Sequence, residues 1–141
     1  MTRNDDATGV VLSLIVGYAL IVAPAAGASP EKPILFEFWH VGDDVLSERL
    51  AVEVDKAFEL SPGFTLSEGK KQGTLIVTIP ENVDWKPVST RLRVLYKVTF
   101  ATATDHVFRT RKGSCWEDAL SECAAKIVNE ARIAARKGSH R

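Results

Sequence analysis

Cys115 and Cys123 are the two cysteines of the chain, and their thiols are the groups best suited to covalent chemistry. An even cysteine count in an oxidising compartment favours a disulfide. Eight residues along one continuous helix, however, separate two Cα atoms by about 12 Å, whereas a disulfide needs less than about 7 Å. A bridge therefore requires the final helix to begin near Asp118, with Cys115 folded back over its first turns. Otherwise the two thiols stay free or pair between chains.

A catalytic cysteine is a third alternative, because a thiol beside an imidazole can act as a nucleophile. His106 precedes Cys115 by nine residues, but no third group that would orient the imidazole suggests itself. Cys123 also falls on an apolar helical stripe, where a cysteine serves as a small core residue.

His40, Asp43 and Asp44, in the segment Trp-His-Val-Gly-Asp-Asp, form the one sequence cluster of metal-ligating side chains. A metal site needs three or four convergent donors, and this turn supplies at most three. The competing interpretation is that Asp43 and Asp44 cap the helix that follows and favour its positive end. We expect the capping role, with no metal or other cofactor bound.

Trp85 is the first candidate for a binding residue, with Trp39 and Asp84 as further candidates. It lies in the segment from Pro80 to Pro87, which we expect to be a loop between strands. Exposed tryptophan in such loops is enriched at binding surfaces. The alternative is that the Trp85 ring folds back onto the edge of the sheet.

Overall charge and motif content exclude several classes of function. The chain has 18 basic and 18 acidic side chains, so no net field attracts nucleic acid. The motifs G-x-S-x-G, H-E-x-x-H and C-x-x-C and a phosphate-binding glycine loop do not occur in the sequence. Their absence removes the commonest hydrolase, protease, thiol-redox and nucleotide-binding interpretations.

Apolar periodicity predicts the strands that would position these side chains. We expect strands at residues 34–39, 64–66, 74–79, 90–103 and 107–110. In the longest of them, apolar residues from Leu92 to Phe100 alternate with polar ones, which indicates one buried and one solvated face.

Two helices are predicted on either side of this run of strands. Leu46, Leu50, Val54 and Phe58 recur at helical spacing in the first, which spans residues 45–60 and ends at a Ser-Pro-Gly sequence. The second carries one apolar stripe with the members Trp116, Leu120, Cys123, Ile127, Ala131 and Ala134. We expect Ser114 and Glu117 to form a capping box at its start.

The order of these elements is strand, helix, three or four strands, helix, which predicts an α+β domain. We expect a mixed or antiparallel sheet with both helices packed on one face. The single domain would span residues 34–136, after a short linker at 29–33 and before a basic, disordered tail at 137–141.

The first 28 residues have the form of a secretory signal peptide. An apolar run at residues 10–23 is followed by Pro24, and Ala26 and Ala28 stand where a cleavage site would need small residues. The run covers roughly 21 Å, short of the ~30 Å hydrocarbon core of a bilayer. Cleavage and release into the periplasm are therefore favoured over an inner-membrane anchor formed by residues 10–23.

One family resemblance follows from the stretch Ile34 to Glu68. With Leu46-Ser47-Glu48-Arg49-Leu50 in its helix and Ser61-Pro62-Gly63-Phe64 at its bend, it resembles the opening of the N-terminal domain of the Tol-Pal translocation protein. It is also similar to the periplasmic domain of the curli secretion channel. The resemblance implies a periplasmic interaction module of the envelope and carries over no functional residue.

We therefore expect an exported, non-enzymatic protein-interaction module of the cell envelope. It would bind another envelope protein, or itself, through a sheet edge or through the sheet face that the helices leave open. The alternatives are a small-ligand or metal-binding periplasmic protein, or an enzyme whose site is not recognisable in sequence. We expect no nucleic-acid partner, and membrane contact only if residues 10–23 are retained.

Overall fold

The computed structural model describes residues 32–69, 71–102 and 106–139 of the chain. The expected signal segment at 1–28 lies outside the described residues. No helix within these ranges is both long and apolar enough to cross a membrane. The elements follow one another as β1 (Ile34–His40), α1 (Val45–Glu59), β2 (Phe64–Leu66), β3 (Leu75–Ile79), β4 (Asp84–Val88), β5 (Arg91–Ala101), β6 (Val107–Trp116), the 3₁₀ turn η1 (Glu117–Ala119) and α2 (Leu120–Gly138).

The strands form one mixed sheet with β5 as its longest member. β1 pairs in parallel with β2 and with β3. β5 pairs antiparallel with β3, β4 and β6. Because β6 runs along most of one edge of β5, β3 and β4 share the other edge, one after the other.

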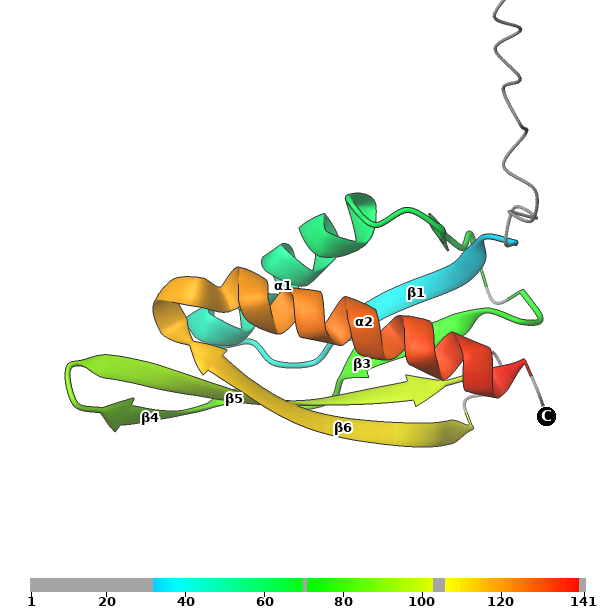
Figure 1. Cartoon of the computed structure of the whole chain (residues 1–141). Helices are drawn as coiled ribbons and strands as arrows, with labels where there is room; N and C mark the ends of the chain where they lie inside the picture. Colours follow the sequence, from blue (N-terminus) through cyan, green and yellow to red (C-terminus); the bar gives the residue numbers. More distant parts are fainter. Residues whose placement is uncertain (1–31, 70, 103–105, 140–141) are drawn as a thin grey trace, which may run out of the picture. The chain divides into compact units, whose positions relative to one another are not determined.

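Both helices lie over the same face of the sheet (Figure 1). α2 contacts β3, β5 and β6 and packs along α1. α1 reaches the sheet mainly through Phe58, whose ring stacks on Phe36 of β1 at a centroid distance of 4.3 Å. The α+β class, the mixed sheet and the placement of the helices are confirmed, with five strands between the helices in place of the expected three or four.

The core lies between this sheet face and the helices, as the alternation along β5 predicted. Val94, Val98 and Phe100 are fully buried, and the alternate residues of β5 face away from the helices. Tyr96 belongs to the same buried row and lies over Gly113, its partner on β6. A Cβ at residue 113 would collide with the Tyr96 ring, so this position requires glycine.

Two segments differ from their predicted structure because of pairing with β5. Residues 84–88 form strand β4, although they were expected to be a loop. Pro87 is tolerated there because β4 has a free outer edge. β6 extends to Trp116, six residues beyond its predicted end, so Trp116 ends a strand and does not belong to the apolar stripe of α2.

The start of α2 is also corrected. Ser114 lies within β6 and accepts a hydrogen bond from Arg93, and Glu117 pairs with Arg49 of α1, so no capping box forms. The 3₁₀ turn supplies the transition from strand to helix, and no side chain caps either of its ends. At the other end α2 continues through Lys137 to Gly138, so the first two residues of the predicted tail are helical.

Candidate functional site

Cys115 and Cys123 form a disulfide, with 5.6 Å between their Cα atoms. The geometry is the first of the alternatives above, since Cys115 lies in β6 and α2 begins only at Leu120. Both cysteines are buried, and the part of the chain that the structure describes has no free thiol. The interpretation of Cys115 as a nucleophile with His106 as its base is therefore wrong.

The expected capping role of Asp44 is confirmed. Asp44 is the N-cap residue of α1, and its side chain accepts a hydrogen bond of 2.7 Å from the backbone N–H of Ser47. The Nδ1 atom of His40 lies 3.2 Å from the carbonyl oxygen of Gly42. Within residues 32–69, 71–102 and 106–139 no group of three His, Cys, Asp or Glu side chains could hold a metal ion.

A hydrogen-bonded junction joins the β1–α1 turn to the segment before β4. The backbone N–H of Asp43 donates to Asn82 Oδ1 at 3.0 Å. The buried hydroxyl of Ser47 accepts a hydrogen bond of 2.9 Å from the backbone N–H of Val83. A Cβ on Gly42 would meet both Asn82 and Ser47 at under 3 Å, so the contact needs glycine. The junction fixes where β4 starts and thereby positions Asp84 and Trp85.

Trp39 and Trp85 lie beside this junction and are both largely exposed, with 59% of each residue accessible. The Trp85 ring therefore does not fold back onto the sheet. Register separates the two residues, because Trp39 is in line with Thr78 and Thr99 on the open face, whereas Trp85 pairs with the core residue Val94. The structure therefore does not bring Trp39 and Trp85 to one surface, and Asp84 shares a face with Trp39 but lies on β4.

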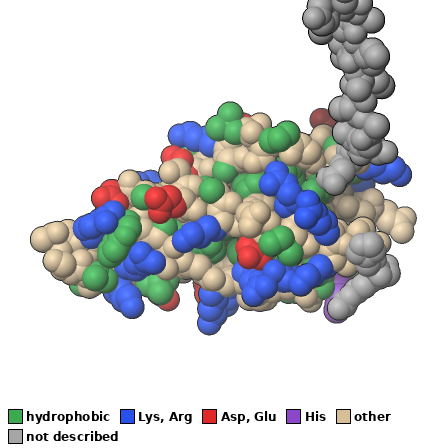
Figure 2. Space-filling model, in the orientation of Figure 1, with side chains coloured by type: hydrophobic (Ala, Val, Ile, Leu, Met, Phe, Trp, Pro, Cys, Tyr) green, Lys and Arg blue, Asp and Glu red, His purple; other side chains and the backbone are tan. Residues whose placement is uncertain are grey.

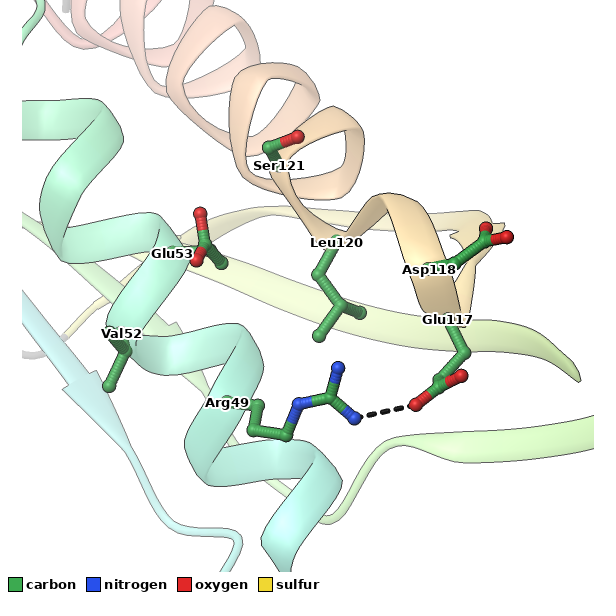
Figure 3. A pocket seen from close by; sticks show the side chains of 7 residues that line it. All are labelled: Arg49, Val52, Glu53, Glu117, Asp118, Leu120 and Ser121. Atoms are coloured by element: carbon green, nitrogen blue, oxygen red, sulfur yellow. Dashed lines mark hydrogen bonds and ion pairs between the residues drawn. The ribbon is translucent and has the colours of Figure 1, made fainter.

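One pocket of about 310 Å³ lies between α1 and the start of α2 (Figure 3). Arg49 and Glu117 point toward one another across it at 2.6 Å, beside the buried Leu120. Two of its other acidic residues are also paired, Asp118 with Arg91 and Glu53 with Lys56. Of these ion pairs, Arg49–Glu117 joins α1 to the turn before α2, and each acidic side chain that lines the pocket has a basic partner.

A larger cavity of about 740 Å³ lies at the opposite end of α2. The first residues of β1 and β3 and the last turn of α2 line it, with Phe108 among the apolar side chains. Among the described residues that line it, no side chain is ionisable. Such a lining suits an apolar ligand.

Within the described ranges, two titratable side chains have clearly shifted pKa values. Burial, and to a lesser extent the neighbouring Glu59, raise the pKa of the Asp55 carboxyl, while His40 lowers it. Burial, with a smaller contribution from Glu130, raises the pKa of Tyr96 to about 12. Neither residue lines the two cavities described above, so both shifts bear on stability.

The Tyr96 shift makes stability depend on pH in alkaline solution. In the unfolded chain Tyr96 loses its proton near pH 10, whereas in the folded protein it keeps it to about pH 12. Between about pH 10 and pH 12 the unfolded state therefore binds fewer protons than the folded state. The free energy of unfolding should fall by roughly 2–3 kcal/mol as the pH rises through this range. Urea titrations at a series of pH values would measure the slope. Equal slopes in wild type and Tyr96→Phe would contradict the expectation.

Sequence reasoning missed a cluster at the start of β5. The Arg91 and Arg93 guanidinium carbons lie 4.3 Å and 4.8 Å from the centroid of the Trp116 ring, within cation–π distance. The alternating arginines of β5 were visible in the sequence. Their aromatic partner could not be recognised from the sequence, because the spacing of Trp116 matches the apolar stripe of the second predicted helix.

Comparisons with known proteins leave the family open. No family model and no curated protein matches the chain. Among solved structures, a minor lipoprotein from Acinetobacter baumannii is similar with a TM-score of 0.42 and 12% identity, over 75% of this chain and 94% of that one. A similarity of this size establishes neither a shared family nor a shared function.

Proposed function

We propose that the chain is an exported, non-enzymatic module of the cell envelope that binds another envelope protein. The exposure of Trp85 on the edge strand β4 carries the proposal, and the exposed Trp39 on the opposite face of the sheet is a second candidate contact. Tryptophan is the residue type most enriched among the energetically dominant contacts of protein interfaces. A domain that buries aromatic residues such as Phe58 and Phe100 yet leaves Trp85 in water is suited to hold a partner at β4.

The disulfide supports an extracytoplasmic compartment, because such bonds persist where thiols are oxidised and are rare in the cytoplasm. The expected signal segment at residues 1–28 points to the same compartment. We include in the proposal a relationship to the periplasmic domains of the Tol-Pal translocation protein and the curli secretion channel. The bend at Gly63, with φ of +91°, between α1 and β2 is the local feature that supports it.

Support for binding in place of catalysis comes from the roles of the reactive side chains. Cys115 and Cys123 are bonded to each other, and Asp44 caps α1. The outer edge of β6 is a poor contact surface by comparison, because it carries Arg109, Arg111 and Lys112, and charged side chains of this kind discourage strand addition.

In vivo crosslinking from intact envelopes would test the proposal. We expect wild type to capture a defined envelope protein and Trp85→Ala or Trp39→Ala to weaken capture about 30-fold, as loss of a dominant interface tryptophan does. Leu60→Ala is the matched control, since Leu60 is exposed at the far end of α1. Unchanged capture by both tryptophan variants, or no captured protein at all, would refute the proposal.

The cavity at the end of α2 favours a second candidate function, the binding of a small apolar ligand. Its volume of about 740 Å³ and its uncharged lining are the specific observations. Recovery of an apolar small molecule with the purified protein, together with no protein partner, would favour this second candidate.

A further inference from the structure

The face of the sheet that points away from the helices is rich in basic side chains. Register places alternate residues of β4, β5 and β6 on this face, because their neighbours Val94, Tyr96 and Val98 point into the core. At the left of Figure 2, over the β4–β5 hairpin, Lys and Arg side chains lie among hydrophobic ones. We call this surface the basic face, and its cationic members are Lys86, Arg91, Arg93, Lys97 and Lys112.

Two pairs of like charges stand directly opposite each other on the basic face. Lys86 of β4 pairs in register with Arg93 of β5, and Lys97 of β5 with Lys112 of β6. Like charges in directly opposed cross-strand positions destabilise a sheet. Two such pairs on one face make that face less stable than opposite charges would. Positions where a sequence gives up stability in this way are often functional surfaces.

Intramolecular partners neutralise only part of this charge. Arg91 pairs with Asp118 at 2.7 Å and Lys97 with Glu81 at 3.0 Å. Lys86 and Lys112 are exposed and have no acidic partner within the described ranges. The strands contribute two acidic residues to this face, Asp84 of β4 and Glu37 of β1, and the Glu37 carboxylate accepts a hydrogen bond of 3.1 Å from Trp39 Nε1. An external anion would therefore relieve a repulsion that the fold leaves in place.

Tryptophan accompanies the cations on this face. Trp116 lies at one side, in line with Lys86 and Arg93, and the exposed Trp39 lies on β1 at the other. Tryptophan beside Lys and Arg is the composition of protein surfaces at the membrane–water interface. Each lysine ammonium group is a point charge on a flexible side chain. It is therefore better suited to lipid phosphates, which move laterally in a bilayer, than to a partner's carboxylate held in one position. Neither cavity described above includes a residue of the basic face.

We propose that the basic face binds the anionic phospholipid headgroups of a bilayer surface. Electrostatic attraction of the cations to the headgroup phosphates would supply the affinity, and Trp39 and Trp116 would contact the interfacial region. The Lys86–Arg93 pair and the Lys97–Lys112 pair are four residues apart along β5, which is about 13 Å. The two pairs would therefore contact different lipid headgroups. This inference does not depend on the protein partner proposed above, because it uses a different set of residues apart from Trp39.

Vesicle sedimentation tests the proposal with the chain that begins at Ser29, whose core lies within the described compact unit. The probes are phosphatidylcholine vesicles with and without roughly one-third phosphatidylglycerol. We expect salt-sensitive binding to the anionic vesicles only. Lys86→Gln/Lys97→Gln/Lys112→Gln should reduce partitioning about 100-fold, since each cation near an anionic surface contributes about fivefold. The control Lys56→Gln/Arg136→Gln/Lys137→Gln removes the same charge from exposed helix positions.

Several outcomes separate the proposal from its alternatives. The basic-face variant removes two like-charge pairs and the Lys97–Glu81 ion pair, so its melting temperature should stay close to that of wild type, and lost binding cannot then be attributed to unfolding. Equal losses in both triple variants would show that net charge alone acts and would overturn the proposal. So would binding that ignores lipid charge, or tight binding to soluble poly-glutamate without vesicle binding, which would point to an acidic protein instead. Retained vesicle binding with abolished crosslinking in Trp85→Ala would support both proposals separately.

Discussion

Replacement of Phe58 by Ala is expected to lower the free energy of unfolding by about 4 kcal/mol, within the range for removing a buried aromatic side chain. Phe58 is 2% exposed. Its ring stacks on Phe36 of β1 and meets Phe64 of β2 edge-on at 5.0 Å. The side chain therefore ties α1 to two strands, and its loss leaves a cavity where three aromatic rings meet. Urea denaturation followed by tryptophan fluorescence would measure the change.

Val52→Ala is the matched control for Phe58→Ala. Val52 lies on the same helix but is half exposed, so its truncation should change the free energy of unfolding by less than about 0.5 kcal/mol. A loss below about 1 kcal/mol in Phe58→Ala would show that the three-ring cluster repacks freely and does not anchor α1. Similar losses in both variants would show that burial against the strands does not set the cost, because Val52 is half exposed and alanine favours the helix at both positions.

The elements that could be predicted from sequence are those whose own periodicity matches their burial. In α1 the apolar residues recur every three or four positions, and Leu50, Val54 and Phe58 from that stripe are buried. In β5 the alternation from Leu92 to Phe100, interrupted by Leu95, matches the buried row. Local pattern and tertiary packing agree in these segments, so sequence alone was sufficient.

β4 and the second half of β6 were missed because a neighbour, not their own composition, makes them strands. β4 has five exposed residues and contains Pro87, which argues against a strand anywhere except at an edge. β6 continues through Lys112, Gly113 and Ser114, a polar sequence typical of a turn. The hydrogen bonds that hold both segments come from β5, and such pairing is not encoded within either segment.

For the candidate surfaces, the sequence could indicate which residues to consider but not how the sheet arranges them. Trp85 and Trp39 could be named from sequence, but their placement on opposite faces follows from register. The opposition of Lys86 to Arg93 likewise depends on where β4 pairs with β5. A shift of one residue would have moved Lys86 to the helix side of the sheet.

Replacement of both Cys115 and Cys123 by Ala is expected to cost about 2.5 kcal/mol of stability. The two cysteines are separated by eight positions, and closing a loop of that size in the unfolded chain reduces its entropy by about this amount. The bond also fixes the end of β6 to the first turn of α2 across η1, a transition that no side chain caps. Chemical denaturation of the purified double variant would give the difference, with Ser121→Ala in the same loop as the control.

Because both cysteines are buried, the same bond predicts how the protein responds to reductant. A thiolate can reach the sulfur atoms only after the α2 end of the loop opens, so reduction of the folded protein should be slow and should speed up in mild urea. Protein made in a reducing cytoplasm should then match the double alanine variant in stability, while exported protein should exceed both. Thiol titration would confirm that the two forms differ in oxidation state. If they were then equally stable, the disulfide would contribute nothing to the free energy of unfolding.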